Sequence, residues 1–510
     1  METDNSILNG LKETTNFKLT ENGATAHYTT LNAVYDMFAF GGAYRNRTDA
    51  DCILLFKNAI EQDKELALKC LFYLRDVRGG QGERRFFRVC LKWLANEYPY
   101  LVTNNIDLIA EYGRWDDMFV LLDTPVEEVM LKFMKNQLRI DMDSKTPCLL
   151  GKWMPSENAS SRKTKRTADK LRKYLKMTHK QYRIMLSDLR RKINIVERLM
   201  SANKWDKIEF DKIPSKAGLI YKNAFARRDI IKAKYENFIK SEKTTVNAKT
   251  LYPYEVVAKA LEVCGSRYWY NENETDFDNV DRIAVEKYWN NLPNYFADDA
   301  GENPMLCVVD TSGSMTCGSG ASKPINVAIG LGIYAAERMN GAFKNHYISF
   351  ASRPQLIKVE GVDFVDKVER IYRTNLIDNT NLEAVFKLLK DMVTTGKAKA
   401  EDLPSTICVI SDMEIDDGTS GWSSHNQVWT EKNAATFMEN IRKEWAAAGL
   451  KMPKLTYWNV DARNNTILDL GPNVSYVSGC SPVIFEQVTK GITGVELMLN
   501  KLRKQKIWND

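Results

Sequence analysis

Asp310, Ser312 and Ser314 place one carboxylate and two hydroxyls at alternating positions of the chain. They follow the apolar run from Met305 to Val309, which predicts a buried strand of a parallel sheet. The carboxyl ends of such strands are where open α/β sheets bind ligands. Carboxylate and hydroxyl oxygens are hard donors, so the spacing favours a magnesium or manganese site over a zinc site. An ordinary turn is the alternative, because Asp, Ser and Gly are common turn residues.

Two further oxygen donors are expected at the ends of other strands. The run STICVISDME (405–414) is a second apolar strand that ends in a carboxylate, Asp412. The segment DNTNLEAVFKLLKDMV (378–393) places Thr380 in a polar loop ahead of an amphipathic helix, with Asn381 as the alternative donor. Together these motifs resemble the metal-ion-dependent adhesion site of von Willebrand factor A domains. The resemblance implies a first loop with Asp310, Ser312 and Ser314, a second with Thr380 and a third with Asp412. It also implies an open coordination position for an acidic ligand group.

The C-terminal part, residues 301–510, alternates predicted strands with predicted helices. This order indicates a doubly wound, mostly parallel sheet covered on both faces. Beyond the two strands above, strands are expected over residues 346–351, 355–360, 454–462 and 473–480. Helices are expected over residues 324–340, 364–373 and 433–450, and from about Pro482 to Lys506.

Residues 1–300 have a different pattern, with long helical periodicity and few strand signals. Apolar residues recur at three- and four-residue spacing over 54–77, 83–96 and 126–142, among other segments. Helices of this length joined by short breaks suggest paired helices stacked as an irregular solenoid. We therefore predict an all-helical domain over residues 1–300 and an α/β domain over residues 301–510.

Several motifs of the chain are similar to those of an uncharacterised family related to the Ro (TROVE) proteins. They are RDVRGGQGERRFFRVCLKWL (75–94), YGRWDDMF (112–119), KWMPSENASS (152–161), YRIMLSDLRRKINIVERLM (182–200), WDKIEFDKIPSKAGLIY (205–221) and VISDMEID (409–416). The resemblance implies HEAT-like helical repeats, closed into a ring by a von Willebrand A-like domain. It also implies binding of small structured RNAs on a basic surface and of single-stranded RNA ends in the central hole.

Basic residues concentrate in one segment of the helical part, residues 151–192. Fourteen Lys or Arg face three acids there, although the whole chain carries a formal net charge of only +6. Charge interleaved with a few aromatics fits phosphate contacts and base stacking. The candidate RNA-binding residues are Arg162, Lys163, Lys165, Arg166, Lys170, Arg172 and Lys173. A solvated helical face that aids solubility is the alternative.

Composition narrows the remaining functions. We expect a cytoplasmic protein without a membrane span, because no apolar stretch approaches the required length and METDNSILNG does not resemble a signal sequence. Nine cysteines without a Cys-x-x-Cys pair suggest reduced thiols. No nucleophile elbow or phosphate loop is present, and no general base is evident, so we predict a binding protein and not an enzyme. The expected ligands are RNA and an acidic group of a protein partner, with magnesium or manganese as the cofactor. A protein-binding or assembly scaffold, cellular or viral, that uses the metal site without RNA is the alternative.

Overall fold

The computed structural model describes residues 15–20, 24–265, 279–299, 301–350, 354–374, 381–415 and 437–507. Contacts between residues divide the chain into two compact units. The sheet unit comprises residues 1–63 and 251–504, and the helical unit comprises residues 64–250 and 505–510. These units are defined by contacts between residues and include segments from both ends of the chain. The predicted domains, 1–300 and 301–510, are continuous ranges of sequence and stay a prediction.

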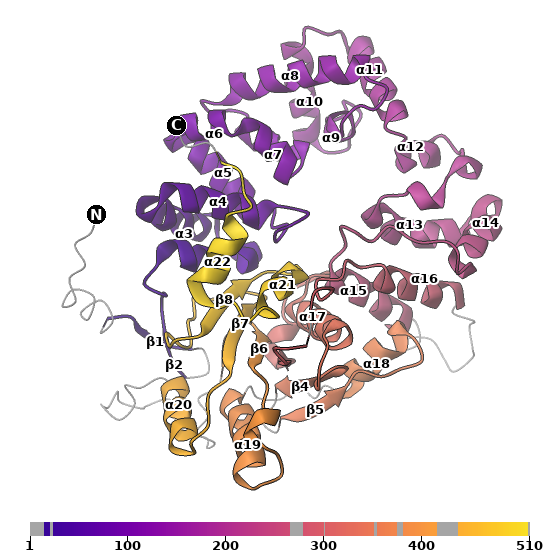
Figure 1. Cartoon of the computed structure of the whole chain (residues 1–510). Helices are drawn as coiled ribbons and strands as arrows, with labels where there is room; N and C mark the ends of the chain where they lie inside the picture. Colours follow the sequence, from indigo (N-terminus) through magenta and orange to yellow (C-terminus); the bar gives the residue numbers. More distant parts are fainter. Residues whose placement is uncertain are drawn as a thin grey trace. The chain divides into compact units, whose positions relative to one another are not determined.

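Within the described residues of the sheet unit, six strands form one mixed sheet in the order β5-β4-β3-β6-β7-β8 (Figure 1). All neighbouring strands are parallel except β4 and β5, which are antiparallel. The predicted sheet, mostly parallel and in the C-terminal part, is therefore confirmed. The strands are β3 (Met305–Asp310), β4 (His346–Phe350), β5 (Gln355–Lys358), β6 (Thr406–Ser411), β7 (Lys454–Asn459) and β8 (Val474–Ser478).

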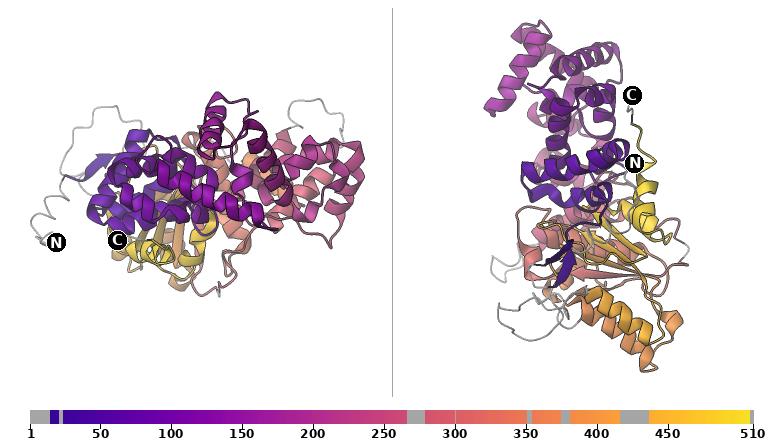
Figure 2. Two further views of the ribbon diagram at one scale, coloured as in Figure 1. Left: turned by 90° about the horizontal axis from the view of Figure 1, so that it is seen from above. Right: turned by 90° about the vertical axis from the view of Figure 1, so that its left-hand side faces the viewer.

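Burial explains why the central strands are uniformly apolar. Every residue of β3 and of β6 is buried, as expected for strands covered on both faces. Helix α17 packs against β3, β4 and β6. Its Gly332 allows this approach, because a Cβ there would lie 2.6 Å from Cγ2 of Val309. Figure 2 shows α19 and α20 on the side of the sheet opposite α22. The helices from residue 251 onward are α15 (Pro253–Gly265), α16 (Asn279–Asn290), α17 (Pro324–Arg338), α18 (Phe364–Thr374), α19 (Leu382–Thr394), α20 (Phe437–Ala447), α21 (Phe485–Val488) and α22 (Gly494–Leu502).

The N-terminal segment belongs to the sheet unit, which the sequence did not predict. It contains a short antiparallel pair, β1 (Phe17–Leu19) and β2 (Thr25–His27), followed by α2 (Ala33–Phe40) and α3 (Asp49–Gln62). Helix α2 packs on the edge strand β8, where the Ser478 hydroxyl donates to the Phe38 carbonyl at 3.0 Å and accepts from the Gly42 N–H at 2.9 Å. These bonds attach residues far apart in the chain to one strand.

The helical unit consists of successive helices that pack against near neighbours, as α13 does against α14 and α11 against α9. This confirms the helical character predicted there, while HEAT-like repeats and a closed ring stay predictions. Its helices are α4 (Lys64–Arg75), α5 (Arg85–Glu97), α6 (Pro99–Asn104), α7 (Ile106–Tyr112), α8 (Glu127–Asp143), α9 (Leu150–Trp153), α10 (Arg162–Tyr174), α11 (His179–Lys192), α12 (Val196–Ser201), α13 (Ser215–Arg227) and α14 (Asp229–Lys240).

A buried ion network accounts for two of the sequence motifs in this unit. The Asp117 carboxylate accepts from Arg75 Nε at 2.8 Å and from Arg88 Nε at 2.6 Å. Asp117 and Arg75 are both almost fully buried. The glycine-rich turn after α4 packs on the same helix, since a Cβ at Gly80 would lie 1.9 Å from the Tyr73 carbonyl oxygen. Arg75 and Arg88 therefore have a structural role, and the turn is not free to enclose a phosphate.

Two predicted helices are interrupted in the structure. The helix expected over residues 54–77 breaks at Asp63, which is extended (φ −151°, ψ 105°) between α3 and α4. The helix expected from Pro482 to Lys506 is divided into α21 and α22. Gly491 lies between the two helices with φ of +67°, and Gly494 is the first residue of α22 with φ of +61°. This left-handed conformation interrupts a right-handed helix and suits glycine. No helix among the described residues is long and apolar enough to cross a membrane.

Gly42→Ala tests whether the N-terminal segment is part of the sheet unit. A Cβ at Gly42 would lie 2.7 Å from the carbonyl oxygen of Ser478, so the backbone of β8 would have to move. We expect the free energy of unfolding to fall by about 1–3 kcal/mol, measured by urea denaturation. Lys57→Ala, at an exposed position of α3, is the control and should change little. Equal stability of the Gly42 variant and the wild type would contradict this packing.

Candidate metal centre and basic surface

The candidate metal residues Asp310 and Asp412 lie where the strand order of the sheet reverses direction. The chain passes from β3 outward to β4 and β5, and from β6 outward on the other side to β7 and β8. In doubly wound sheets this switch point leaves a crevice at the carboxyl ends of the two central strands. Asp310 ends β3 and Asp412 directly follows β6, so both carboxylates lie at that position.

The first loop is folded around the Asp310 carboxylate. Its Oδ1 accepts from the Ser312 N–H at 2.9 Å, and its Oδ2 accepts from the Ser411 hydroxyl at 2.6 Å. The Ser312 and Ser314 hydroxyl oxygens lie 3.0 Å apart. Asp310 is fully buried and Ser312 nearly so. The loop therefore brings three of the predicted donors together, and Ser411 is a contributor that the sequence did not single out.

Asp412 completes this group from the neighbouring strand. Its side chain is buried, and Oδ2 accepts from an Arg463 guanidinium nitrogen at 2.9 Å. Burial raises the pKa of Asp412 to about 7, and the Asp310 charge acts in the same direction. Arg463 and a hydrogen bond from Ser314 lower the pKa and offset part of that rise. Asp310, Ser312, Ser314 and Asp412 thus form one connected cluster.

The donor set of this cluster fits a hard divalent cation. Two carboxylates buried side by side repel each other, and Arg463 donates to one of them, Asp412. The side-chain donors are oxygens, the ligand type that magnesium and manganese prefer. Among the described residues no group of three or more His, Cys, Asp or Glu is arranged to hold a metal, so a site here must include hydroxyls. Asp310, Ser312, Ser314 and Asp412 are the residues that would hold the ion.

Most of the second predicted loop lies outside the residues that the structure describes. Thr380 is outside the described residues. Asn381, the alternative donor, is the N-cap of α19, and its side chain accepts from the Ala384 N–H at 2.9 Å. The choice between these two residues therefore stays a prediction.

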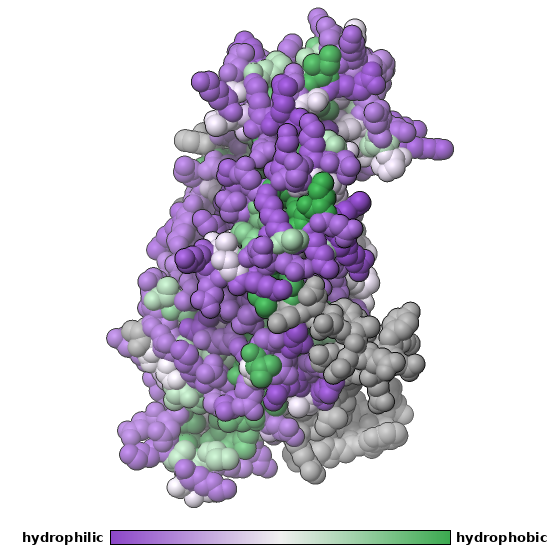
Figure 3. All heavy atoms as spheres, turned by 90° about the vertical axis from the view of Figure 1, so that its right-hand side faces the viewer, coloured by the Kyte–Doolittle hydropathy of each residue, from purple (hydrophilic) through white to green (hydrophobic). Residues whose placement is uncertain are grey.

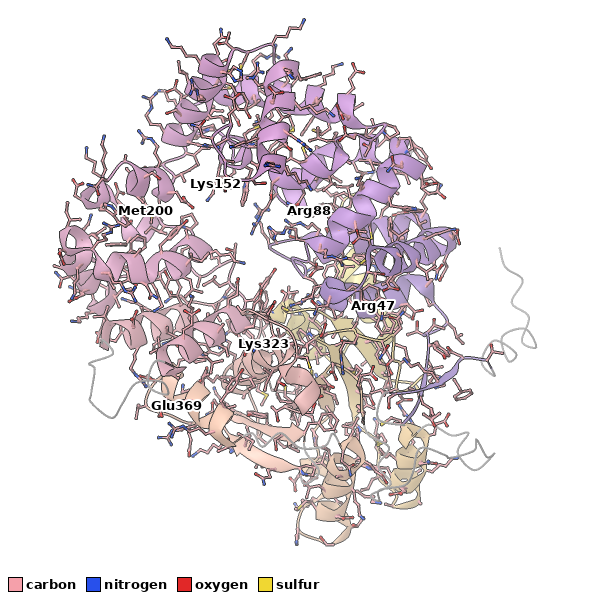
Figure 4. The ribbon with its side chains drawn as sticks, turned by 180° about the vertical axis from the view of Figure 1, so that it is seen from behind. Arg47, Arg88, Lys152, Met200, Lys323 and Glu369 are labelled. Atoms are coloured by element: carbon pink, nitrogen blue, oxygen red, sulfur yellow. The ribbon has the colours of Figure 1, made fainter. Side chains whose placement is uncertain are left out.

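The loop that holds Arg463 is fixed by the N-terminal segment. The Ala462 N–H donates to the Ala43 carbonyl at 3.2 Å, and the Arg47 guanidinium donates to the Arg463 carbonyl. Asn46 donates to the Asp461 carboxylate at 3.1 Å. Figure 4 labels Arg47. These contacts position Arg463 beside Asp412, and nothing in the local sequence pattern could have predicted them, because the partners are more than 400 residues apart.

The seven candidate RNA-binding residues all lie on α10, but the structure separates them into two groups. Lys170 contacts Asp123 at 2.8 Å and Glu127 at 2.6 Å. Arg172 contacts Asp169 at 2.6 Å and Glu157 at 3.2 Å, and Lys173 contacts Asp169 at 2.7 Å. These three cations are committed to ion pairs that the sequence alone did not reveal. The other four are exposed, with no ion pair among the described residues: Arg162, Lys163, Lys165 and Arg166.

The carboxyl pair predicts a pH dependence of stability in metal-free protein. Because the pKa of Asp412 is raised from 3.8 to about 7, the folded protein binds the Asp412 proton more tightly than the unfolded chain. The stability from this group is present in full below pH 3.8 and is lost as the pH rises to about 7. We expect Asp412→Asn to remove this fall, measured by urea denaturation in EDTA between pH 4 and 8. Parallel profiles for the variant and the wild type would contradict the assignment.

Comparison with known proteins places the chain in a family. The model of one family, described as "Domain of unknown function (DUF2828)", matches residues 20–146 and 150–299. A second model, "Domain of unknown function (DUF7788)", matches residues 304–494. The "Uncharacterized protein L728" of Acanthamoeba polyphaga mimivirus is 30% identical over 498 residues, which cover 90% of this chain and 81% of that protein.

Among solved structures, the chain is similar to the one titled "Crystal structure of Deinococcus radiodurans RO (RSR) protein". The identity is 11% and the TM-score 0.42, over 91% of this chain and 100% of that chain. A likeness at this level does not establish a shared fold. The two DUF2828 matches span more than half of the chain, and the mimivirus relative covers most of it. The chain therefore belongs to the DUF2828 family.

Proposed function

We propose that this protein is a non-enzymatic binding protein with a magnesium-dependent site in its sheet unit and an RNA-binding surface on its helical unit. The observation that carries the metal half is the burial of Asp310 and Asp412 in one hydrogen-bonded cluster with Ser312 and Ser314. Two buried carboxylates that lie close enough for the charge of Asp310 to raise the pKa of Asp412 favour cation binding. The four hydrogen-bonded side chains converge from two adjacent strands, so little reordering is needed on binding.

The cation would supply positive charge and a coordination position for an acidic group of a partner. The chain's own residues would do the rest: the hydrogen bonds from Ser312 N–H and Ser411 hydroxyl hold Asp310 in place. Arg463 holds Asp412 and moderates its charge. Hydrolysis would need a general base beside an activated water, and the two buried carboxylates are used as ligands in this proposal. Recognition of an acidic ligand is therefore favoured over catalysis.

The RNA half rests on the start of α10. Its first turn carries Arg162 and Lys163 and no acid, although the positive end of the helix dipole lies there. Cations at the N-terminus of a helix are repelled by the positive end of its dipole. Lys165 and Arg166 add two more positive charges. A bound phosphate would relieve this repulsion. Helical proteins that bind RNA backbones use such exposed Lys and Arg clusters, and the sequence resemblance to Ro proteins points to the same ligand class.

A scaffold that binds only proteins is the second candidate. It is favoured by the ion pairs of Lys170, Arg172 and Lys173, which reduce the charge available to nucleic acid. The face drawn in Figure 3 is mostly hydrophilic, with small separate hydrophobic patches. The described residues of that face therefore offer no broad apolar docking area, and a polar or charged partner suits them better.

Asp310→Asn tests the metal site. The substitution preserves size but removes one of the two buried charges, so magnesium should no longer raise the melting temperature. Asp469→Asn is the matched control, since Asp469 is also a buried carboxylate of the sheet unit but pairs with Arg442. The control should retain the magnesium response. An equal response of the Asp310 variant and the wild type in calorimetric titration with magnesium would show that the site is misassigned.

Charge reversal on α10 tests RNA binding. Each phosphate neutralised on a single strand adds roughly 0.7 to the slope of log affinity against log salt. Changing Arg162, Lys163, Lys165 and Arg166 to Glu should therefore flatten the slope by about 3. Affinity should fall for all sequences alike, because phosphate contacts do not read bases.

The control for this experiment has the same change in net charge elsewhere. Exposed lysines of the sheet unit are changed to Glu: Lys344, Lys397, Lys399 and Lys451. The two variants are compared with wild type by fluorescence anisotropy of a labelled single-stranded RNA at several salt concentrations. If both variants lose affinity equally, the effect is one of net charge and α10 is not the RNA surface.

A further inference from the structure

A second polar site lies within the helical unit, separate from the basic start of α10. It is a pocket of about 570 Å³ between α11, α12 and the loop that follows α9. Its volume falls within the range of small-molecule sites. Figure 4 labels Lys152, which lines the pocket, and Met200, which lies on α12.

The wall of this pocket is held firmly. Gly151 allows α9 to lie directly on α11, because a Cβ there would be 2.6 Å from Cβ of Leu189. The buried Tyr182 donates to the Pro155 carbonyl at 2.9 Å. Arg190 then clamps the same loop through three neutral acceptors, Gly151 O at 3.1 Å, Met154 O at 2.8 Å and Ser156 Oγ at 2.9 Å. The pocket is thus formed before any ligand binds.

The lining has excess positive charge. Arg190 is bonded to neutral oxygens, so no carboxylate among the described residues cancels its charge. Arg183 and Arg198 also line the pocket and form no ion pair in the described part of the chain. Glu157 is already paired with Arg172 at 3.2 Å and with His179 at 2.7 Å. Arg183 and Arg198 are therefore available to bond an anion, and Arg190, whose nitrogens hold the loop, adds its uncancelled charge. Arginine is the side chain best suited to phosphate.

One acceptor in the lining lacks a donor. Glu197 contacts Lys152 at 4.0 Å and accepts from the Tyr221 hydroxyl at 3.5 Å, both through Oε1. Its Oε2 is buried without a hydrogen-bond partner in the structure. A ligand that combines an anionic group with a hydroxyl donor would satisfy both features. Leu186 and Ile195 add apolar surface to the same pocket.

We propose that this pocket binds a nucleotide, with its phosphate at Arg183, Arg190 and Arg198 and a ribose hydroxyl donating to Glu197. Phosphate, hydroxyls and a flat apolar base match the three kinds of lining. The nucleotide is either free or the terminal unit of an RNA, and both present the same phosphate and ribose. The proposal does not depend on α10, because a free nucleotide would bind here even if α10 bound no RNA.

The test is calorimetric titration of the full chain with adenosine 5′-monophosphate, adenosine and inorganic phosphate. The monophosphate should bind at least tenfold more tightly than either part. Arg183→Gln and Arg198→Gln should each weaken it about tenfold, since each removes a charge-assisted hydrogen bond. Glu197→Gln should reduce the preference for the ribonucleotide over its 2′,3′-dideoxy analogue. Arg191→Gln is the matched control on α11, because Arg191 is outside the lining and pairs with Asp188 at 2.8 Å.

A second arm uses an RNA tetramer with and without a 5′-phosphate to separate the two sources. If Arg183→Gln and Arg198→Gln weaken binding of the 5′-phosphorylated tetramer but not of the unphosphorylated tetramer or the free monophosphate, the site is supported and its ligand is an RNA end. Dependence of the free monophosphate would assign it to free nucleotide. Absence of any phosphate-dependent binding, or equal binding by the two pocket variants and the Arg191 control, would overturn the proposal. Melting temperatures confirm that the exposed Arg183 variant is folded.

Discussion

Two carboxylates, Asp310 and Asp412, are buried next to each other at the switch point of the sheet, and much of the sheet unit follows from this arrangement. A buried carboxylate is unfavourable unless it accepts hydrogen bonds or meets a cation. The Asp310 carboxylate accepts hydrogen bonds from the Ser312 N–H and the Ser411 hydroxyl. The Asp412 carboxylate accepts a hydrogen bond from the Arg463 guanidinium. A divalent cation beside the two carboxylates would offset their mutual repulsion.

The arginine is the part of this arrangement that departs from a simple loop-based metal site. Arg463 follows β7, and its loop is held by Ala43, Asn46 and Arg47 of the N-terminal segment. The segment also packs on β8 through Gly42 and its neighbours. Residues near the start of the chain therefore help to determine the electrostatics of a site formed by residues beyond 300. This explains why contacts group residues 1–63 with the sheet.

The sequence predicted the local features of this architecture well. β3, β6 and α17 were predictable because their burial produces continuous apolar runs and helical spacing, and a carboxylate at each strand end marks the crevice. The division into α21 and α22 could have been anticipated from Gly491 and Gly494, because glycine readily adopts the left-handed conformation found at helix boundaries.

The long-range features were not predictable, because they depend on partners distant in the chain. The short pair β1–β2 has three residues in each strand and too little periodicity to detect. Composition predicted the positive charge of the basic segment correctly, but it did not show which of its cations are already in ion pairs and which are free to bind a ligand. Nothing in the sequence distinguishes Lys170 from an exposed lysine, whereas the structure pairs it with Asp123 and Glu127. The Arg463–Asp412 pair needed the fold as well.

The most direct test of the central claim is a crystal structure of the protein grown with manganese, with data collected at the manganese absorption edge. Manganese prefers the same oxygen donors as magnesium and gives an anomalous signal that identifies it. The account predicts an anomalous peak within coordination distance of the Asp310 carboxylate and the Ser312 and Ser314 hydroxyls, with Asp412 beside it. Manganese bound elsewhere in the crystal, with no anomalous peak at this cluster, would contradict it.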